Sequence, residues 1–312
     1  MNKLVVLTGP TAVGKTSLSI NLAKAINGEI ISADCMQVYK HMDIGTAKIM
    51  PDEMDGVCHH LIDVIEPTED FHVVRFKEMV LKAMDEIYAK GKIPIICGGT
   101  GFYIQAILYD IQFTDQEIDH EYRAYLEEYA DIHGNEALHD MLKKVDIESA
   151  ESIPANNRKR VIRALEYYKQ TGEQFSVHNK RERDRISPYN FAYFVLNDDR
   201  ELLYNRIDLR VDKMAEAGLV EEVKKLLDYG CKPGMTSMDG IGYKEIISSI
   251  NGEMSLNDAL ELIKKNSRNY AKRQLTWFRR EKEVVWLDKT ELITEQQLLD
   301  KILLTLKEKG II

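Results

Sequence analysis

Short apolar runs alternate along this chain with longer segments in which apolar residues recur every three or four positions. The apolar runs at residues 4–7, 29–32, 93–97 and 191–196 predict buried strands. The helical spacing predicts helices over residues 15–26, 73–89, 200–217, 219–229 and 255–279. Strands that alternate with helices predict an α/β fold with a parallel, doubly wound sheet, which binds ligands at the carboxyl ends of its strands.

The pattern changes between the third and fourth predicted strands. Residues 114–188 contain charged helical segments and no convincing strand. We therefore expect a helical insertion domain over residues 114–188, and an α/β core with C-terminal helices from residues 1–113 and 189–312.

Composition places the chain among ordinary globular proteins. With 312 residues and 44% hydrophobic content it can bury a sizeable core. The apolar start at residues 4–7 leads straight into Thr8-Gly9-Pro10, so neither a signal peptide nor a membrane span is predicted, and we expect a cytoplasmic protein.

The four cysteines are widely spaced, and no pair has the CxxC spacing. We expect free thiols, with neither a disulfide framework nor a cysteine zinc site. His59 and His60 stand beside Cys58, but adjacent side chains rarely converge on one ion, so metal ligation is the less favoured interpretation here.

The net charge of −9 by itself argues against a nucleic-acid partner. The distribution of charge along the chain changes this conclusion. Residues 114–153 hold 12 Asp or Glu and 3 Lys or Arg, whereas residues 154–190 hold 9 Lys or Arg and 4 Asp or Glu. Residues 264–282 add 8 Lys or Arg and a single acid, Glu281. These two basic islands indicate places where a polyanion could be held, although solvated helix faces have the same composition.

The first predicted strand leads into a sequence that fits GxxxxGK[ST] and opens the first predicted helix, which is the context that a P-loop requires. In such a loop the backbone N–H groups and the helix N-terminus bind phosphate oxygens, the lysine neutralises them, and the hydroxyl of Thr16 can ligate Mg²⁺. The predicted diphosphate-binding residues are Gly9, Pro10, Thr11, Ala12, Val13, Gly14, Lys15 and Thr16.

Other polar residues follow the predicted strands at the same edge of the sheet. Asp34 comes after the second strand, where a carboxylate could bind Mg²⁺, accept a proton or cap a helical turn. Asp63 is a weaker candidate for a metal ligand or a supporting role. Gly98-Gly99-Thr100-Gly101 forms a flexible turn after the third strand.

Two predicted helices carry aligned cations. A helix that begins near Asn156 places three cations, Lys159, Arg160 and Arg163, opposite the side on which Val161, Leu165 and Tyr168 would pack. The helix after the fourth strand aligns Arg206, Arg210 and Lys213, and an arginine there could reach a phosphate or a leaving group.

Several blocks together resemble the bacterial tRNA dimethylallyltransferases, in order over nearly the whole chain. They are the P-loop, Ser-Ala-Asp-Cys-Met-Gln-Val-Tyr39, Asp43-Ile-Gly-Thr-Ala-Lys48, His-His-Leu-Ile-Asp63, Gly-Gly-Thr-Gly-Phe-Tyr103, Arg163-Ala-Leu-Glu166, Gly240-Ile-Gly-Tyr-Lys-Glu245 and Lys272-Arg-Gln-Leu-Thr-Trp-Phe-Arg279. Cys35 stands where many members have serine.

The resemblance implies transfer of a dimethylallyl group from its diphosphate to the exocyclic N6 amine of the adenosine 3′ of the tRNA anticodon. It implies that Asp34 is the base, that Lys15, Thr16, Arg210 and Mg²⁺ stabilise the leaving diphosphate, and that the adenosine is flipped out of its stack. The tRNA partner is the anticodon stem-loop, no membrane is involved, and a monomer is expected. The implied tRNA contacts are Asp34, Cys35, Met36, Gln37, Thr100, Arg123, Lys159, Arg160, Val161, Ile162, Arg163, Gly240, Ile241, Gly242, Tyr243, Lys244 and Glu245.

Two other functions share parts of this pattern. A P-loop small-molecule kinase would have the same loop and aspartate, but it gives no reason for two basic islands. A GTP-dependent RNA-binding switch would need NKxD, whereas the nearest string here is Asn179-Lys180-Arg181-Glu182.

Overall fold

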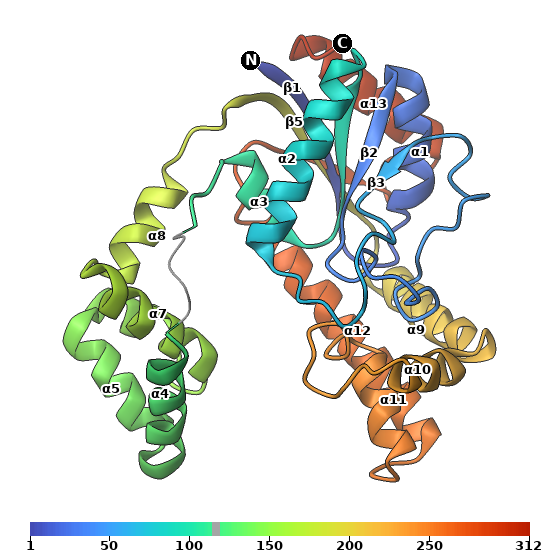
Figure 1. Cartoon of the computed structure of the whole chain (residues 1–312). Coiled ribbons are helices and arrows are strands. Elements are labelled where there is room, and N and C mark those ends of the chain that lie inside the picture. The colour runs from blue at the N-terminus through green and yellow to red at the C-terminus, as the bar shows by residue number, and fades with distance from the viewer. Residues whose placement is uncertain (114–118) are drawn as a thin grey trace. The chain divides into compact units, whose positions relative to one another are not determined.

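The computed structural model describes residues 1–113 and 119–312. Its centre is a six-stranded sheet in the order β3-β2-β4-β1-β5-β6, in which every neighbouring pair is parallel (Figure 1). The strands are β1 (Asn2–Thr8), β2 (Gly28–Ala33), β3 (His59–His60), β4 (Ile93–Gly98), β5 (Tyr189–Asn197) and β6 (Val284–Asp288). The predicted parallel α/β fold is confirmed.

Helices cover both faces of the sheet, which is why its central strands are apolar at nearly every position. On one face α1 (Lys15–Ile26) and α13 (Glu295–Glu308) pack together, and on the other lie α2 (Val73–Ala89) and α3 (Gly101–Leu108) (Figure 1). Val5 and Leu7 of β1, for example, share one buried cluster with Leu18 of α1 and Ile302 of α13.

Four further helices follow β5 and lie beyond the carboxyl ends of the strands (Figure 1). They are α9 (Arg200–Glu216), α10 (Leu219–Asp228), α11 (Tyr243–Ile250) and α12 (Leu256–Phe278). Helix α12 contacts α9, α11 and α3, so it connects this helical layer to the edge of the sheet at which parallel strands bind ligands.

The chain divides into two compact units, residues 1–108 with 188–312 and residues 109–187. The second unit is helical where it is described and contains α4 (His120–His133), α5 (Asn135–Val145), α6 (Ile147–Ser152), α7 (Arg158–Thr171) and α8 (Phe175–Arg183). It has its own core, which includes Leu126, Leu138, Leu142, Val161 and Leu165. Residues 114–118, where the predicted insertion begins, lie outside the described residues.

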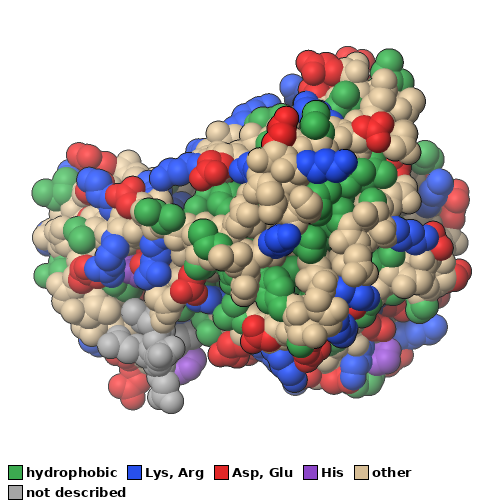
Figure 2. All heavy atoms as spheres, turned by 90° about the horizontal axis from the view of Figure 1, so that it is seen from above, with side chains coloured by type: hydrophobic (Ala, Val, Ile, Leu, Met, Phe, Trp, Pro, Cys, Tyr) green, Lys and Arg blue, Asp and Glu red, His purple; other side chains and the backbone are tan. Residues whose placement is uncertain are grey.

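The surface charge and the lengths of the helices concern two predicted properties, the binding of a polyanion and the absence of a membrane span. On the face of the first unit that carries both chain termini, Lys and Arg side chains are interspersed with Asp and Glu, as on an ordinary solvated surface (Figure 2). Among residues 1–113 and 119–312, no helix combines the length and apolar character needed to cross a bilayer.

All four cysteines are free thiols, as expected.

Candidate functional site

The loop between β1 and α1 has the strand–loop–helix context that its sequence predicts. Gly14 caps the amino end of α1 with a φ of 95°, a left-handed conformation that glycine adopts without strain. The Nζ of Lys15 donates to the carbonyl oxygens of Gly9 at 3.0 Å and Pro10 at 2.8 Å, so the ammonium bridges the loop on which it stands. The ammonium of Lys15 and the amino end of α1 thus belong to one loop, a combination that suits a diphosphate.

The electrostatic surroundings of Lys15 show which groups the fold brings near this loop. Burial lowers the pKa of Lys15 to about 8, Arg210 contributes in the same direction, and Cys97 and Asp34 oppose the shift. Asp34, which follows β2, and Arg210 of α9 therefore lie close enough to the P-loop lysine to act on its charge. An ammonium with this pKa remains mostly protonated at neutral pH.

Asp34 follows β2 at the carboxyl edge, and its side chain serves the local backbone. Its Oδ1 accepts from the backbone N–H of Met36 at 2.8 Å and of Gln37 at 3.3 Å. The capping interpretation is thus realised for one carboxylate oxygen. The Oδ2 has no hydrogen-bond partner among the described residues, which leaves it able to accept a proton.

Arg210 and Arg206 stand one turn apart on α9 but differ in their surroundings. Arg210 keeps solvent contact, while the protein atoms around it lower its pKa and Asp34 acts in the opposite direction. Arg206 instead pairs with Asp198, whose side chain is buried. Of the two, Arg210 is therefore the guanidinium that can meet an anion beside Lys15 and Asp34.

Thr16 is exposed in the first turn of α1, so its hydroxyl is accessible. Magnesium prefers hard oxygen ligands and commonly combines a protein hydroxyl or carboxylate with substrate phosphate oxygens. The Thr16 hydroxyl is a ligand of this kind, and the Asp34 carboxylate, which acts on the charge of the adjacent Lys15, is another, so the residues present fit a phosphate-bound Mg²⁺.

Cys35 lies between the Asp34 turn and the turn after β4. Burial raises the pKa of the Cys35 thiol to about 12, Asp34 adds to the shift, and a hydrogen bond with Thr100 reduces it. The thiol is therefore neutral at physiological pH. The structure brings two predicted RNA-binding residues, Cys35 and Thr100, into direct contact.

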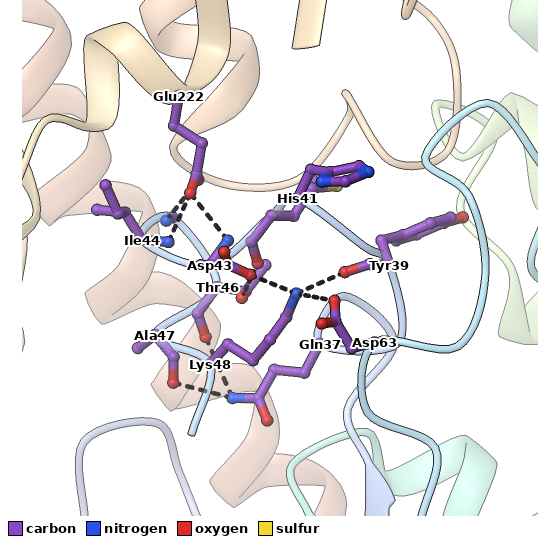
Figure 3. Close-up of polar contacts among 12 residues, drawn as sticks. Gln37, Tyr39, His41, Asp43, Ile44, Thr46, Ala47, Lys48, Asp63 and Glu222 are labelled. Carbon is purple, nitrogen blue, oxygen red and sulfur yellow. Dashed lines mark hydrogen bonds and ion pairs between the residues drawn. The ribbon is translucent and has the colours of Figure 1, made fainter. Parts of the chain in front are cut away.

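A buried lysine fixes the loop that follows Asp34 (Figure 3). The Nζ of Lys48 donates to the carbonyl oxygen of Tyr39 at 2.7 Å, to Asp43 at 2.6 Å and to Asp63 at 2.7 Å. All three ammonium protons are thus satisfied, although the side chain is only 3% exposed. Asp63, which the sequence left as a possible metal ligand, is an ion-pair partner of this lysine.

The same loop is held from α10 by Glu222, which sequence reasoning missed (Figure 3). Its carboxylate accepts from the backbone N–H groups of Asp43 at 2.8 Å, Ile44 at 2.7 Å and Gly45 at 3.0 Å. It also accepts from the hydroxyl of Tyr243 at 2.8 Å. The one signal in the sequence is that Glu222 falls on the apolar face of its helix, between Leu219 and Leu226. Its backbone partners in the loop are about 180 residues away.

Gln37 also supports this loop, which limits its predicted role in reading a base. Its Nε2 donates to the carbonyl oxygens of Thr46 at 3.2 Å and Ala47 at 3.1 Å (Figure 3). The amide nitrogen is therefore occupied within the protein. A contact of Gln37 with adenosine would have to use its Oε1 or its backbone.

The segment from Gly240 to Glu245 lies beside Met36, because a Cβ added at Gly240 would come within 2.5 Å of the Met36 Cε. Two side chains of this segment are buried, so a contact of these two residues with tRNA would have to use their backbone. Tyr243 is 1% exposed and bonds Glu222, while Glu245 is 2% exposed and accepts from the Gly242 N–H at 2.8 Å to cap α11. The exposed side chain here is Lys244.

Helix α7 of the second unit has the two faces that its sequence predicts. Lys159 and Arg160 are exposed and Arg163 is half-buried, which keeps the cationic face available. Val161 and Ile162, also predicted as tRNA contacts, are 0% and 2% exposed because they pack into the core of this unit. Their side chains therefore belong to the core, and a contact of these two residues with tRNA would have to use their backbone.

Near β3, the structure unites Cys58 and His60 with Glu29, which the sequence reasoning did not connect. The His60 Nε2 lies 2.8 Å from a Glu29 oxygen and 3.5 Å from the Cys58 Sγ. Burial raises the pKa of Glu29, but hydrogen bonds from Lys92, His60 and Lys90 outweigh it and lower the value to about 2. Since two ammonium groups already neutralise this carboxylate, the cluster is an ion-pair network and a poor place for a further cation.

Comparison with known proteins completes the description of the site. Residues 37–281 match the family model described as IPP transferase. The chain is 58% identical over its full length to the tRNA dimethylallyltransferase of Lachnoclostridium phytofermentans, all of which is covered. It is 44% identical to the tRNA isopentenylpyrophosphate transferase of Bacillus halodurans, with a TM-score of 0.74 over 99% of this chain and 98% of that one. A eukaryotic dimethylallyltransferase acting on tRNA has 29% identity and a TM-score of 0.83, over all of this chain and 80% of that one.

Proposed function

Since the chain belongs to the IPP transferase family, we propose that it transfers a dimethylallyl group from dimethylallyl diphosphate to the N6 amine of the adenosine 3′ of the anticodon in tRNA. The observation that carries the proposal is the convergence of Lys15, Asp34 and Arg210 at the carboxyl edge of the sheet. This arrangement supplies anion binding and a proton acceptor side by side.

The donor is held by its diphosphate. The P-loop N–H groups that remain free at the amino end of α1 bind the phosphate oxygens, and the Thr11 N–H, which is bonded to Gln274, is not among them. Lys15 and Arg210 balance the charge that develops on the phosphate oxygens. The Thr16 hydroxyl would hold Mg²⁺, which would supply further stabilisation of the developing charge. We expect these groups to act most strongly as the carbon–oxygen bond breaks.

The reaction forms one carbon–nitrogen bond and breaks one carbon–oxygen bond. The N6 lone pair attacks C1 of the dimethylallyl group, and the electron pair of the broken bond leaves with the diphosphate. The N6 proton passes to the Oδ2 of Asp34, while Oδ1 stays bonded to the turn at Met36 and Gln37. Because that amine is normally stacked within the anticodon loop, the adenosine enters the site flipped out.

Recognition of the anticodon stem-loop requires cations and a pocket. In the second unit, Lys159, Arg160 and Arg163 contact phosphates, and in the first unit Thr100, Met36 and the exposed Lys244 contact the loop. The protein acts as a monomer in the cytoplasm under this proposal.

The proposal is tested by incubating the purified chain with undermodified tRNA and labelled dimethylallyl diphosphate without ATP. Label in the RNA, located at the adenosine 3′ of the anticodon, supports the transferase. The competing P-loop kinase predicts phosphate transfer from ATP to a small molecule and no label in RNA, and that result would overturn the proposal.

A further inference from the structure

The last turns of α12 lie against the two glycine-rich turns at the carboxyl edge of the sheet. Tyr270, Gln274 and Trp277 are spaced by four and three residues, so they share one face of the helix. The ring of Trp277 lies against Gly101, and Tyr270 hydrogen-bonds the side chain of Thr100. Gln274 lies between these two contacts.

Gln274 joins the P-loop to the turn after β4 through both ends of its amide. Its Oε1 accepts from the backbone N–H of Thr11 at 2.9 Å, and its Nε2 donates to the carbonyl oxygen of Gly99 at 2.9 Å. A backbone N–H can only donate and a carbonyl can only accept, so the partners fix which end of the amide is oxygen. The side chain is 5% exposed, which removes competition from water.

The Gln274 amide packs closely against the backbone at Gly99. A Cβ added at Gly99 would lie 2.2 Å from the Gln274 Nε2, which is far inside van der Waals contact. Glycine at position 99 therefore permits the approach of the glutamine. A glutamate at position 274 would keep an acceptor for Thr11 but lose the donor to Gly99, and a methionine would lose both.

The bond to Thr11 takes one N–H of the diphosphate loop out of the set that can meet phosphate. It also anchors the turn between Gly9 and Gly14, the stretch whose shape decides where the remaining N–H groups point. Among the described residues the Gln274 amide bonds Thr11 and Gly99 and not Lys15, so any effect on the reaction passes through the backbone of the loop.

We infer that Gln274 is a positioning residue, which holds the P-loop in the conformation that binds diphosphate by tying Thr11 to Gly99. The inference rests on the proposed function, since it assumes that this loop binds the diphosphate of the donor. The loop is thus held from α12, a helix that follows it by more than 240 residues in the sequence.

The test compares Gln274→Met, which has a similar length and makes neither hydrogen bond, with Gln274→Glu, which retains the acceptor for Thr11. Gln296→Met is the matched control, because Gln296 is exposed on α13 and its amide bonds only Asp300 in the described part of the chain. For each protein we would measure the Kd of inorganic diphosphate with Mg²⁺, the KM of the donor, and hydrogen exchange in peptides that cover residues 9–16.

Gln274→Met is expected to weaken diphosphate binding by about tenfold and to raise the donor KM similarly, because two buried hydrogen bonds are lost. Exchange in the P-loop peptide should accelerate, while exchange in α7 and the tRNA Kd stay unchanged. Gln274→Glu should keep slow exchange at Thr11 even though its added charge weakens diphosphate binding. The control should match the wild type in every measurement.

Unchanged diphosphate affinity and unchanged P-loop exchange in folded Gln274→Met would overturn the inference and leave the proposed function standing. If Gln274→Met does not fold, Gln274→Glu decides: P-loop exchange as fast as in an unstructured peptide would overturn the inference, and slow exchange would support it. A wild-type protein that binds no diphosphate would overturn both the inference and the proposed function.

Discussion

Arg123 of α4 donates through Nε and Nη2 to the two carboxylate oxygens of Glu166 on α7, each at 2.7 Å. Glu166 is 1% exposed, whereas the Arg123 side chain is 39% exposed. The arginine that the sequence assigns to tRNA thus also neutralises a buried carboxylate within its own unit. Loss of tRNA binding in an Arg123 variant would therefore have two possible causes.

We predict that Arg123→Ala lowers the free energy of unfolding by roughly 1–3 kcal/mol, because it leaves the buried Glu166 carboxylate without its partner. Adding Glu166→Gln should recover part of that loss, since the uncompensated charge is then removed. Denaturant unfolding of the two single variants and the double variant measures the coupling. If the changes in unfolding free energy of the two single variants simply add in the double variant, the ion pair does not stabilise the fold. Loss of tRNA binding in an Arg123 variant would then be due to a lost RNA contact.

The second prediction separates the two tasks of Asp34. Asp34→Asn keeps an oxygen that accepts from the Met36 and Gln37 N–H groups but cannot take up a proton at neutral pH, whereas Asp34→Ala loses both functions. Both variants should lose on the order of 10²-fold or more in single-turnover rate, and tRNA should still bind within several-fold. Asp34→Asn should retain the wild-type melting temperature. Near-normal turnover by Asp34→Asn would exclude Asp34 as the base and leave it a turn-capping residue.

The third prediction uses the lowered pKa of Lys15, which is about 8. The protonated form binds the diphosphate, so affinity should be retained below pH 8 and should fall by about tenfold per pH unit above it. Lys15→Arg is the control, because a guanidinium stays charged over this range while the titration of the ligand itself is unchanged. Diphosphate Kd values from pH 6.5 to 9.5 for both proteins decide the matter, and parallel curves would contradict the prediction.

Most elements of the α/β core could be predicted from the sequence. The strands β1, β2, β4 and β5 and the helices α1 and α2 were predictable, because each carries a local periodicity or lies beside a local motif. The two-residue strand β3 is too short for any periodicity. Strand β6 is an edge strand with one fully buried residue, Leu287, so its pattern is weak.

Some residues of the candidate site could likewise be assigned from local sequence, and others could not. Residues 9–16 and Asp34 could be assigned because their chemistry follows from short motifs at strand ends. The roles of Glu222 and Gln274 could not be assigned, since the fold brings their partners close across 179 and 263 residues. The partners of Lys48 lie within 15 residues, but their convergence depends on the irregular path of the loop. Val161 and Ile162 lie within a predicted RNA-binding segment but have buried side chains, because residues three or four positions apart share one face of a helix and this segment includes both faces.

The last prediction concerns the cationic face of α7. Lys159 and Arg160 are exposed, Arg163 is half-buried, and none of the three has an ion-pair partner among the described residues. Such cations are available to phosphates, and each phosphate contact releases counterions when RNA binds. Replacing one contacting cation should therefore reduce the magnitude of the slope of log affinity against log salt by about 0.7 to 0.9.

The measurement is tRNA affinity over a salt series for Arg160→Ala and for the triple Ala variant at positions 159, 160 and 163. Lys82→Ala removes one exposed cation from α2 and serves as the control for net charge. We expect a smaller slope for Arg160→Ala than for the wild type, a still smaller slope for the triple variant, and no change for Lys82→Ala. The rate at saturating tRNA should stay within about twofold, because phosphate contacts position the RNA and take no part in the chemistry. If the triple variant keeps the wild-type slope, this face is merely solvated, and binding must depend mainly on the basic island at residues 264–282.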